Sequence, residues 1–144
     1  MMGDEPGDDD EIVILNRRLR WTKEELTYEA DPAHAKQIWE AMGLHAGSNG
    51  LEKPIVKEDI KDVGDDQKQE RLGPHEASEF RGVAARANYL ALDRMDMQFT
   101  AKEICRDMAE PRKSSWEKLK RLARYLVEYP RLVWRVQTQG SRYR

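Results

Sequence analysis

The last third of the sequence is strongly basic, as a surface that contacts phosphate groups should be. Between Arg112 and Arg144, ten Lys and Arg side chains are opposed only by Glu117 and Glu128, which leaves this stretch with a formal charge of +8. Lys and Arg side chains at helical spacing can neutralise successive phosphates of a nucleic acid and release their condensed counterions. The candidate nucleic-acid-binding residues are Lys118, Arg121 and Arg124. A solvated helix face with no ligand is the alternative interpretation of the same charges.

Other residue types that could do chemistry give weaker patterns. Asp65-Asp66 is the one pair of adjacent aspartates outside the acidic N-terminal stretch, and paired aspartates can hold two Mg²⁺ ions. Here the pair lies in a polar, glycine-bearing stretch, which favours a solvated loop. The three histidines have no ligand-like spacing, so no metal site is assigned. Cys105 lies on an apolar helical stripe and is expected to be a small buried hydrophobe.

Composition excludes several classes of protein. Hydrophobic residues make up 39% of the 144-residue chain and charged residues 36%. No apolar run is long enough to cross a membrane, and the acidic N-terminus has no signal-peptide core, so an intracellular, cytoplasmic protein is expected. A single cysteine excludes a disulfide framework and a cysteine-based zinc site.

The elements that must position these side chains can be inferred from the spacing of apolar residues. Alternation of apolar and polar residues predicts strands over 12–21 and 26–30, joined by a hairpin connection at Thr22–Glu25. Asp31-Pro32 is typical of a helix start. The apolar residues that follow recur at helical spacing up to Gly43, the predicted stop: Ala35, Ile38, Trp39 and Met42.

Three more helices and a short strand over 132–136 are predicted in the C-terminal half. The first covers 76–92 and is rich in alanine, so another element must pack closely against it. The second has Asp93 as its N-cap and Asp96 in a capping-box-like position, and it ends at Pro111. The third starts at Ser114 or Ser115 and stops at Pro130, with its basic candidates expected on the solvent side. Its expected core residues are Trp116, Leu119, Leu122, Ala123 and Leu126.

These elements predict an α+β, mostly helical fold. An N-terminal β-hairpin, one helix, a long loop, a three-helix C-terminal cluster and a short final strand follow one another. Five segments are expected. They are a disordered acidic tail (1–11), a hairpin plus helix (12–44), a flexible loop or linker (45–75), a three-helix region with the final strand (76–136) and a basic tail (137–144).

The order of short motifs in the second half of the chain is distinctive. They are FRGVAARANYLAL at 80–92, DRMDMQF at 93–99, CRDMAEP at 105–111, a tryptophan at 116 and KRLARYL at 120–126. In this order they resemble the conserved tail of the reverse transcriptase of copia-type retrotransposons. Lys53-Pro54 also matches a Lys-Pro loop of that family, and the resemblance covers about residues 12–136. Met95 stands where the family has proline, and Ala85 or Ala87 where it has glycine.

The resemblance implies a grip-like hairpin, thumb-like helices and a connection within a retroelement polyprotein. Such parts of an RNA-directed DNA polymerase hold an RNA–DNA or DNA duplex by its backbone, weakly and without sequence preference. The implied partners are the remainder of the polymerase and a ribonuclease H domain. The family's Tyr-x-Asp-Asp motif, which would bind Mg²⁺, is not in this chain. No catalytic residue and no cofactor are therefore assigned, and the chain alone is expected to be inactive.

A second function from a different class fits the same residues. Amphipathic helices also serve as protein-interaction surfaces, so the chain could be a helical protein–protein interaction module derived from a degenerate retroelement. The basic residues of the helix after Pro111 discriminate the two, because only nucleic-acid binding needs them.

Overall fold

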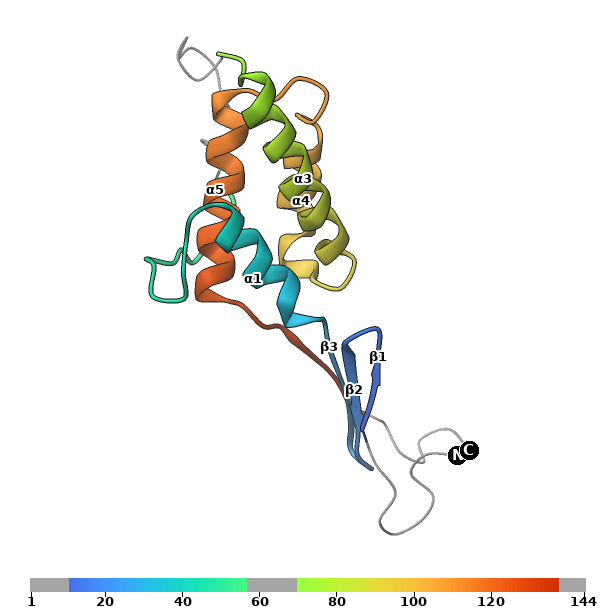
Figure 1. Ribbon diagram of the computed structural model, residues 1–144. Helices are drawn as coiled ribbons and strands as arrows, with labels where there is room; N and C mark the ends of the chain where they lie inside the picture. The colour runs from blue at the N-terminus through green and yellow to red at the C-terminus, as the bar shows by residue number, and fades with distance from the viewer. Residues whose placement is uncertain (1–10, 57–69, 138–144) are drawn as a thin grey trace. The chain divides into compact units, whose positions relative to one another are not determined.

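The computed structural model describes residues 11–56 and 70–137, in two compact units. One unit joins both ends of the chain, from Met1–Asp31 and Arg131–Arg144, and the other is Pro32–Pro130. The first is a β-sheet and the second is helical, so the α+β, mostly helical fold class is confirmed (Figure 1). Asp65-Asp66, the acidic residues 1–10 and the basic residues 138–144 lie outside the described residues.

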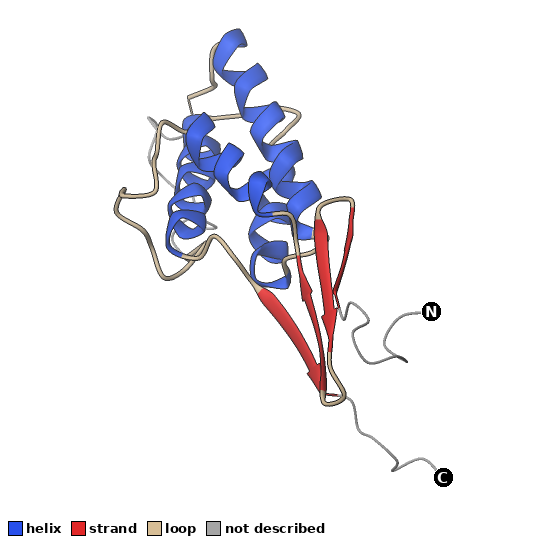
Figure 2. Cartoon of the chain, turned by 60° about the horizontal axis from the view of Figure 1, so that its bottom comes forward, coloured by secondary structure: helices blue, strands red, loops and turns tan. Residues whose placement is uncertain are grey.

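The sheet unit contains four antiparallel strands in the order β1-β2-β3-β4 (Figure 2). Three strands follow one another in the sequence: β1 (Glu11–Ile14), β2 (Arg17–Trp21) and β3 (Glu25–Glu29). The fourth, β4 (Val133–Gln137), pairs with β3 from more than a hundred residues away. A final strand was predicted over 132–136, but its partner was not, because a single sequence holds no signal for long-range pairing.

Two tight connections shape the sheet. The predicted connection between β2 and β3 is confirmed: the Thr22 N–H donates to the Glu25 carbonyl at 2.8 Å, and Thr22 Oγ1 accepts the Glu25 N–H at 3.1 Å. A further turn at Leu15-Asn16 splits the stretch 12–21 into β1 and β2. Both turn residues have positive φ, 51° and 62°, as a two-residue hairpin turn of type I′ requires. Leucine rarely adopts this conformation, so the turn has no clear sequence signal.

The helical unit contains α1 (Pro32–Ala41), α3 (Pro74–Ala91), the 3₁₀ turn η1 (Met95–Met97), α4 (Gln98–Cys105) and α5 (Lys113–Glu128). The start of α1 at Pro32 and its stop before Gly43, where φ is +74°, are as predicted. Helix α1 packs against α3 and α5, and α3 packs against α4. The largest fully buried apolar side chains come from all these elements: Ile38, Phe80, Leu90, Met97, Ile104, Leu119, Leu122 and Leu126.

The alanine-rich face of α3 packs as its composition predicted. Ala77, Ala84, Ala87 and Ala91 are each at most 7% exposed. Small side chains let neighbouring helix backbones approach closely, so α3 can contact α1, α4 and α5 at once. Helix α3 is therefore central to the packing of the helical unit.

Four local predictions for α4 and α5 were wrong. Asp93 does not cap a helix: the chain forms η1 first, with Arg94 at its N-cap, and α4 ends at Cys105 instead of continuing to Pro111. Arg112 is the N-cap of α5, and Ser115 acts from the third position, where its hydroxyl accepts the Arg112 N–H at 3.1 Å. Trp116, expected in the core, is half-buried.

Candidate nucleic-acid interface

Helix α5 has one buried face and one solvent-exposed face. The core-facing predictions for Leu119, Leu122, Ala123 and Leu126 are confirmed, each with no exposed surface. The exposed side chains are Lys113, Glu117, Lys120 and Glu128, and Arg121 and Arg124 are half-buried beside them. This amphipathic pattern leaves a mainly basic outer face.

Lys118 lies at the border of the buried face of α5 and not on the opposite side. Its side chain is only 11% exposed, and its Nζ contacts Asp107 Oδ2 at 3.3 Å. At about 100° per residue, Lys118 is only about 20° around the helix from the buried Tyr125. To reach a phosphate, Lys118 would have to give up this ion pair, so it is a poorer candidate than the sequence suggested.

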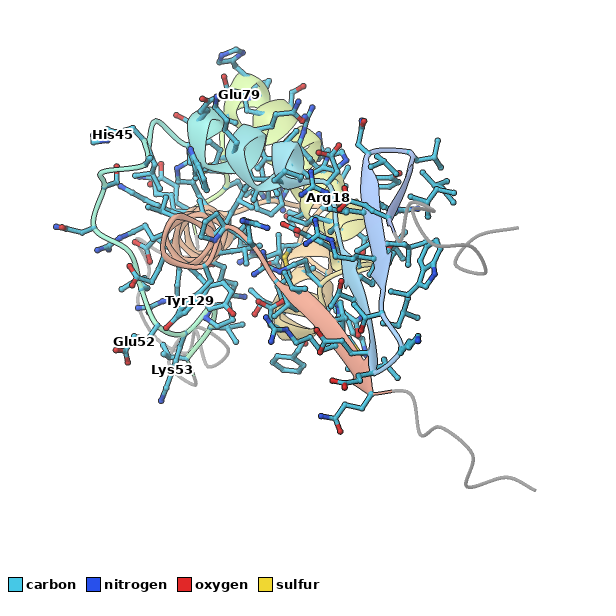
Figure 3. All side chains as sticks on the ribbon, turned by 90° about the horizontal axis from the view of Figure 1, so that it is seen from below. Arg18, His45, Glu52, Lys53, Glu79 and Tyr129 are labelled. Carbon is cyan, nitrogen blue, oxygen red and sulfur yellow. The ribbon has the colours of Figure 1, made fainter. Side chains whose placement is uncertain are left out.

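Arg124 holds a neighbouring segment against α5. Its Nε donates to the Asn49 carbonyl at 3.0 Å, and its own carbonyl accepts the Leu51 N–H at 3.3 Å. Gly50 lies between these contacts, where a Cβ would fall 2.6 Å from Glu128 Cβ, so a larger residue would displace the segment. Figure 3 views α5 along its axis, with His45, Glu52 and Lys53 on the segment that passes it.

The first turn of α5 is tied to the chain that precedes α3. The Lys113 N–H donates to the Glu70 carbonyl at 2.9 Å, and the Leu72 N–H donates to the Pro111 carbonyl at 3.0 Å. Lys113 Nζ also contacts Glu70 Oε2 at 2.6 Å, and this hydrogen bond raises the pKa of the Lys113 ammonium. Glu70 therefore largely neutralises Lys113 as a phosphate ligand.

Three basic side chains lie together on the outer face of α5, Lys120, Arg121 and Arg124, which we call the α5 basic triplet. Neighbours three and four positions apart on a helix have Cβ atoms about 5–6 Å apart, so the charges of the triplet gather in one place. The three-residue spacing of Lys118, Arg121 and Arg124 leaves Lys120 out. A rotation of 100° per residue from the buried leucines places Lys120 on the outer face.

A buried polar network fixes the C-terminal half of α5. Arg94, 1% exposed, donates from Nε to Asp96 Oδ1 at 2.9 Å and from Nη2 to the Tyr129 carbonyl at 2.9 Å. The Tyr125 hydroxyl donates to Asp96 Oδ2 at 2.6 Å. Asp96, expected to cap a helix, instead joins α5 to η1. Such satisfied networks favour one arrangement of the elements they connect.

The pKa values of this network follow from its hydrogen bonds. Burial raises the pKa of Asp96, but hydrogen bonds from Arg94 and Tyr125 outweigh it and leave the pKa below its usual value. Burial and the Asp96 acceptor raise the pKa of Tyr125 to about 12. Both groups thus keep their ordinary charge states near neutral pH, and neither is poised for proton transfer.

Two further observations concern metal binding and thiol chemistry in the described part of the chain. Residues 11–56 and 70–137 contain no group of three or more His, Cys, Asp and Glu side chains that could hold a metal ion. Burial raises the pKa of the half-buried Cys105 thiol, which disfavours the reactive thiolate. Among the described residues, no helix is both long and apolar enough to cross a membrane.

We compared the chain with protein families, curated proteins and solved structures. No protein-family model, no curated protein and no solved structure matches the chain. The resemblance to the copia-type reverse transcriptases stays a prediction from the sequence motifs.

Proposed function

We propose that the chain contributes non-catalytic backbone binding of an RNA–DNA or DNA duplex, as a part of a copia-type reverse transcriptase. The observation that supports this most is the α5 basic triplet, Lys120, Arg121 and Arg124, on the outer face of a helix whose other face is buried. The motifs over 80–130 support the polymerase family. Mg²⁺ and phosphoryl transfer belong to the palm, and the remainder of the polymerase and a ribonuclease H domain are the partners.

The geometry of the triplet suits phosphates more than bases. One turn of helix rises 5.4 Å, close to the spacing of phosphates along a strand, so Lys120 and Arg124 can contact neighbouring phosphates. Contacts of this kind carry no sequence information. The expected affinity is weak, with a Kd of about 10⁻⁴–10⁻⁶ M at physiological salt, and independent of sequence.

A salt titration of the full chain with a labelled RNA–DNA hybrid tests this function. Replacing the triplet with glutamine should lower the slope of log K against log salt by about two to three units. A matched control removes three exposed lysines outside α5, through Lys36→Gln, Lys53→Gln and Lys102→Gln. Thermal melting of both variants confirms that they fold. Equal slopes for the parent and the triplet variant would exclude nucleic-acid binding by α5.

A protein-interaction module is the second candidate function. It is favoured by an exposed apolar cluster around the connection between α3 and α4, where Leu92 is 69% exposed, Met95 61% and Phe99 56%. Clusters of this kind are typical of surfaces that bind other proteins. If the triplet variant binds the hybrid as the parent does, this function becomes the better explanation.

A further inference from the structure

The pairing of the four strands places one row of apolar side chains across the whole sheet. Ile12 lies opposite Leu19, Leu19 opposite Tyr28, and Tyr28 opposite Trp134. Side chains directly opposite each other in an antiparallel pair lie on the same face. A second row on this face contains Trp21, Leu26 and Val136. We call these seven residues the aromatic sheet face.

The other face of the same sheet carries the acidic side chains. Every glutamate in the described strands lies there: Glu11, Glu25 and Glu29. Two of them pair with arginines, since Arg20 Nε donates to Glu11 at 2.9 Å and Arg131 Nη2 donates to Glu29 at 2.8 Å. On the aromatic side, alternation places Arg17 beside the two rows and no acid. A polyanion would therefore meet no carboxylate in the strands of this side.

The size of the aromatic sheet face limits what can bind there. Four strands of four or five residues, spaced about 4.8 Å apart with a rise of about 3.3 Å per residue, give an area of about 300 Å². A stable protein interface needs about 800 Å² on each partner. The face is too small for a second copy of the sheet, but it can hold about two or three stacked bases.

The side chains on this face suit bases in particular. Trp21, Tyr28 and Trp134 are half-buried, so each offers part of its ring on a rigid sheet, and Tyr28 and Trp134 are direct cross-strand neighbours. Unpaired bases stack on such rings whatever their identity. The described residues of this unit, 11–31 and 131–137, form the strands and the connections between them.

We propose that the aromatic sheet face is a stacking site for the unpaired bases of single-stranded nucleic acid. This site is separate from the α5 basic triplet, and it would bind through base stacking instead of duplex phosphates. The two sites can therefore be tested independently. Few phosphates are contacted, so the salt slope of single-strand binding should be small.

Intrinsic fluorescence of the full chain tests the proposal with an oligonucleotide of about ten thymidines. Binding should quench tryptophan emission, and Trp134→Leu should weaken the affinity about 5- to 100-fold. The matched control is Val133→Thr, on the same strand but the opposite face, which should bind within about twofold of the parent.

A second measurement does not depend on the folding of a variant. In the parent protein, the oligonucleotide should protect tryptophan from quenching by acrylamide, because stacked bases cover Trp21 and Trp134. Trp134→Tyr keeps an aromatic ring and should retain the affinity within about threefold. Absence of protection in the parent, or equal affinity of Trp134→Leu and the parent, would overturn the proposal.

Discussion

The two units of the chain satisfy their apolar residues in different ways. The helical unit closes a core of its own, in which Ile38, Phe80 and Leu126 have no exposed surface. The sheet unit has one apolar face whose aromatic residues stay half-buried, and Ile14 and Val136 remain exposed at 49% and 58%. The closed core of the helical unit leaves charged side chains on the outer face of α5 and a few exposed apolar side chains near the start of α4. The described strands instead leave one face of apolar and aromatic side chains only half-buried.

The largest effect that separates the two units is a loss of core packing. Leu126→Ala should lower the free energy of unfolding by about 3–5 kcal/mol, because the side chain is fully buried and its loss leaves a cavity. The same change at the half-buried Leu19 of the sheet should lower it by only about 1–2 kcal/mol. Urea denaturation followed by circular dichroism measures both. Equal losses would mean that the sheet has a closed core as well.

A smaller effect distinguishes the units at high pH. The folded pKa of Tyr125 is about 12, above the ordinary value of 10. The neutral phenol therefore stabilises the helical unit fully below pH 10, and this contribution is lost as the pH rises through 10 towards 12. Tyr125→Phe should lower stability by about 1–3 kcal/mol at pH 8, and the deficit should shrink towards pH 12.

The ion pair of Glu29 in the sheet unit gives the control for the alkaline loss of stability at Tyr125. Glu29 forms an ion pair with Arg131 in the sheet unit, and the hydrogen bond from Arg131 lowers the pKa of Glu29. Its stabilising contribution is present above the ordinary pKa of 4.5 and is lost as the pH falls below it, so it does not change in alkali. A Glu29→Gln variant should therefore show the same alkaline loss as the parent.

A further effect separates two lysines on the same helix. Lys120→Gln should lower the slope of log K against log salt for hybrid binding by about one unit, because this ammonium is exposed. Lys118→Gln should leave the slope unchanged, because Lys118 is paired with Asp107 at the edge of the core. Salt titrations of the two variants measure the difference. The reverse order would mean that duplex phosphates approach α5 from the Asp107 side.

Local patterns in the sequence predicted the helices better than the sheet. Asp31-Pro32, Gly43 and Pro130 define helix ends through backbone rules that act over a few residues, and the ends of α1 and α5 lie within a few residues of them. The register of β4 on β3 joins residues more than a hundred positions apart, which no local rule contains. The aromatic sheet face was missed for this reason, since Trp134 joins Tyr28 only through that pairing.

The contacts of charged residues at the candidate site were also not predictable from local sequence patterns. Asp96 stands where a capping residue would, yet it binds the buried Arg94 and Tyr125, which come from different elements. Lys118 has the spacing of a surface base, yet Asp107 holds it. In both cases a side chain from another part of the chain, Tyr125 for Asp96 and Asp107 for Lys118, outweighed the local preference. The sequence of α5 therefore predicted a basic face correctly, but not which Lys and Arg side chains lie on that face.

The smallest effect concerns the turn that divides β1 from β2. Leu15 has φ of 51° and is 75% exposed, so it bears the strain of a left-handed conformation without gaining burial. Asparagine adopts this conformation at lower cost and is favoured in two-residue hairpin turns. Leu15→Asn should therefore raise the free energy of unfolding of the sheet by about 0.5–1 kcal/mol.

The matched change is Val13→Asn, at an exposed strand position on the charged face. This change should lower the free energy of unfolding, because asparagine is unfavourable in strands. Amide hydrogen exchange in β2 measures both, and slower exchange in Leu15→Asn together with faster exchange in Val13→Asn is expected. Faster exchange in both variants would show that the leucine contributes more through apolar contact than it costs in backbone strain.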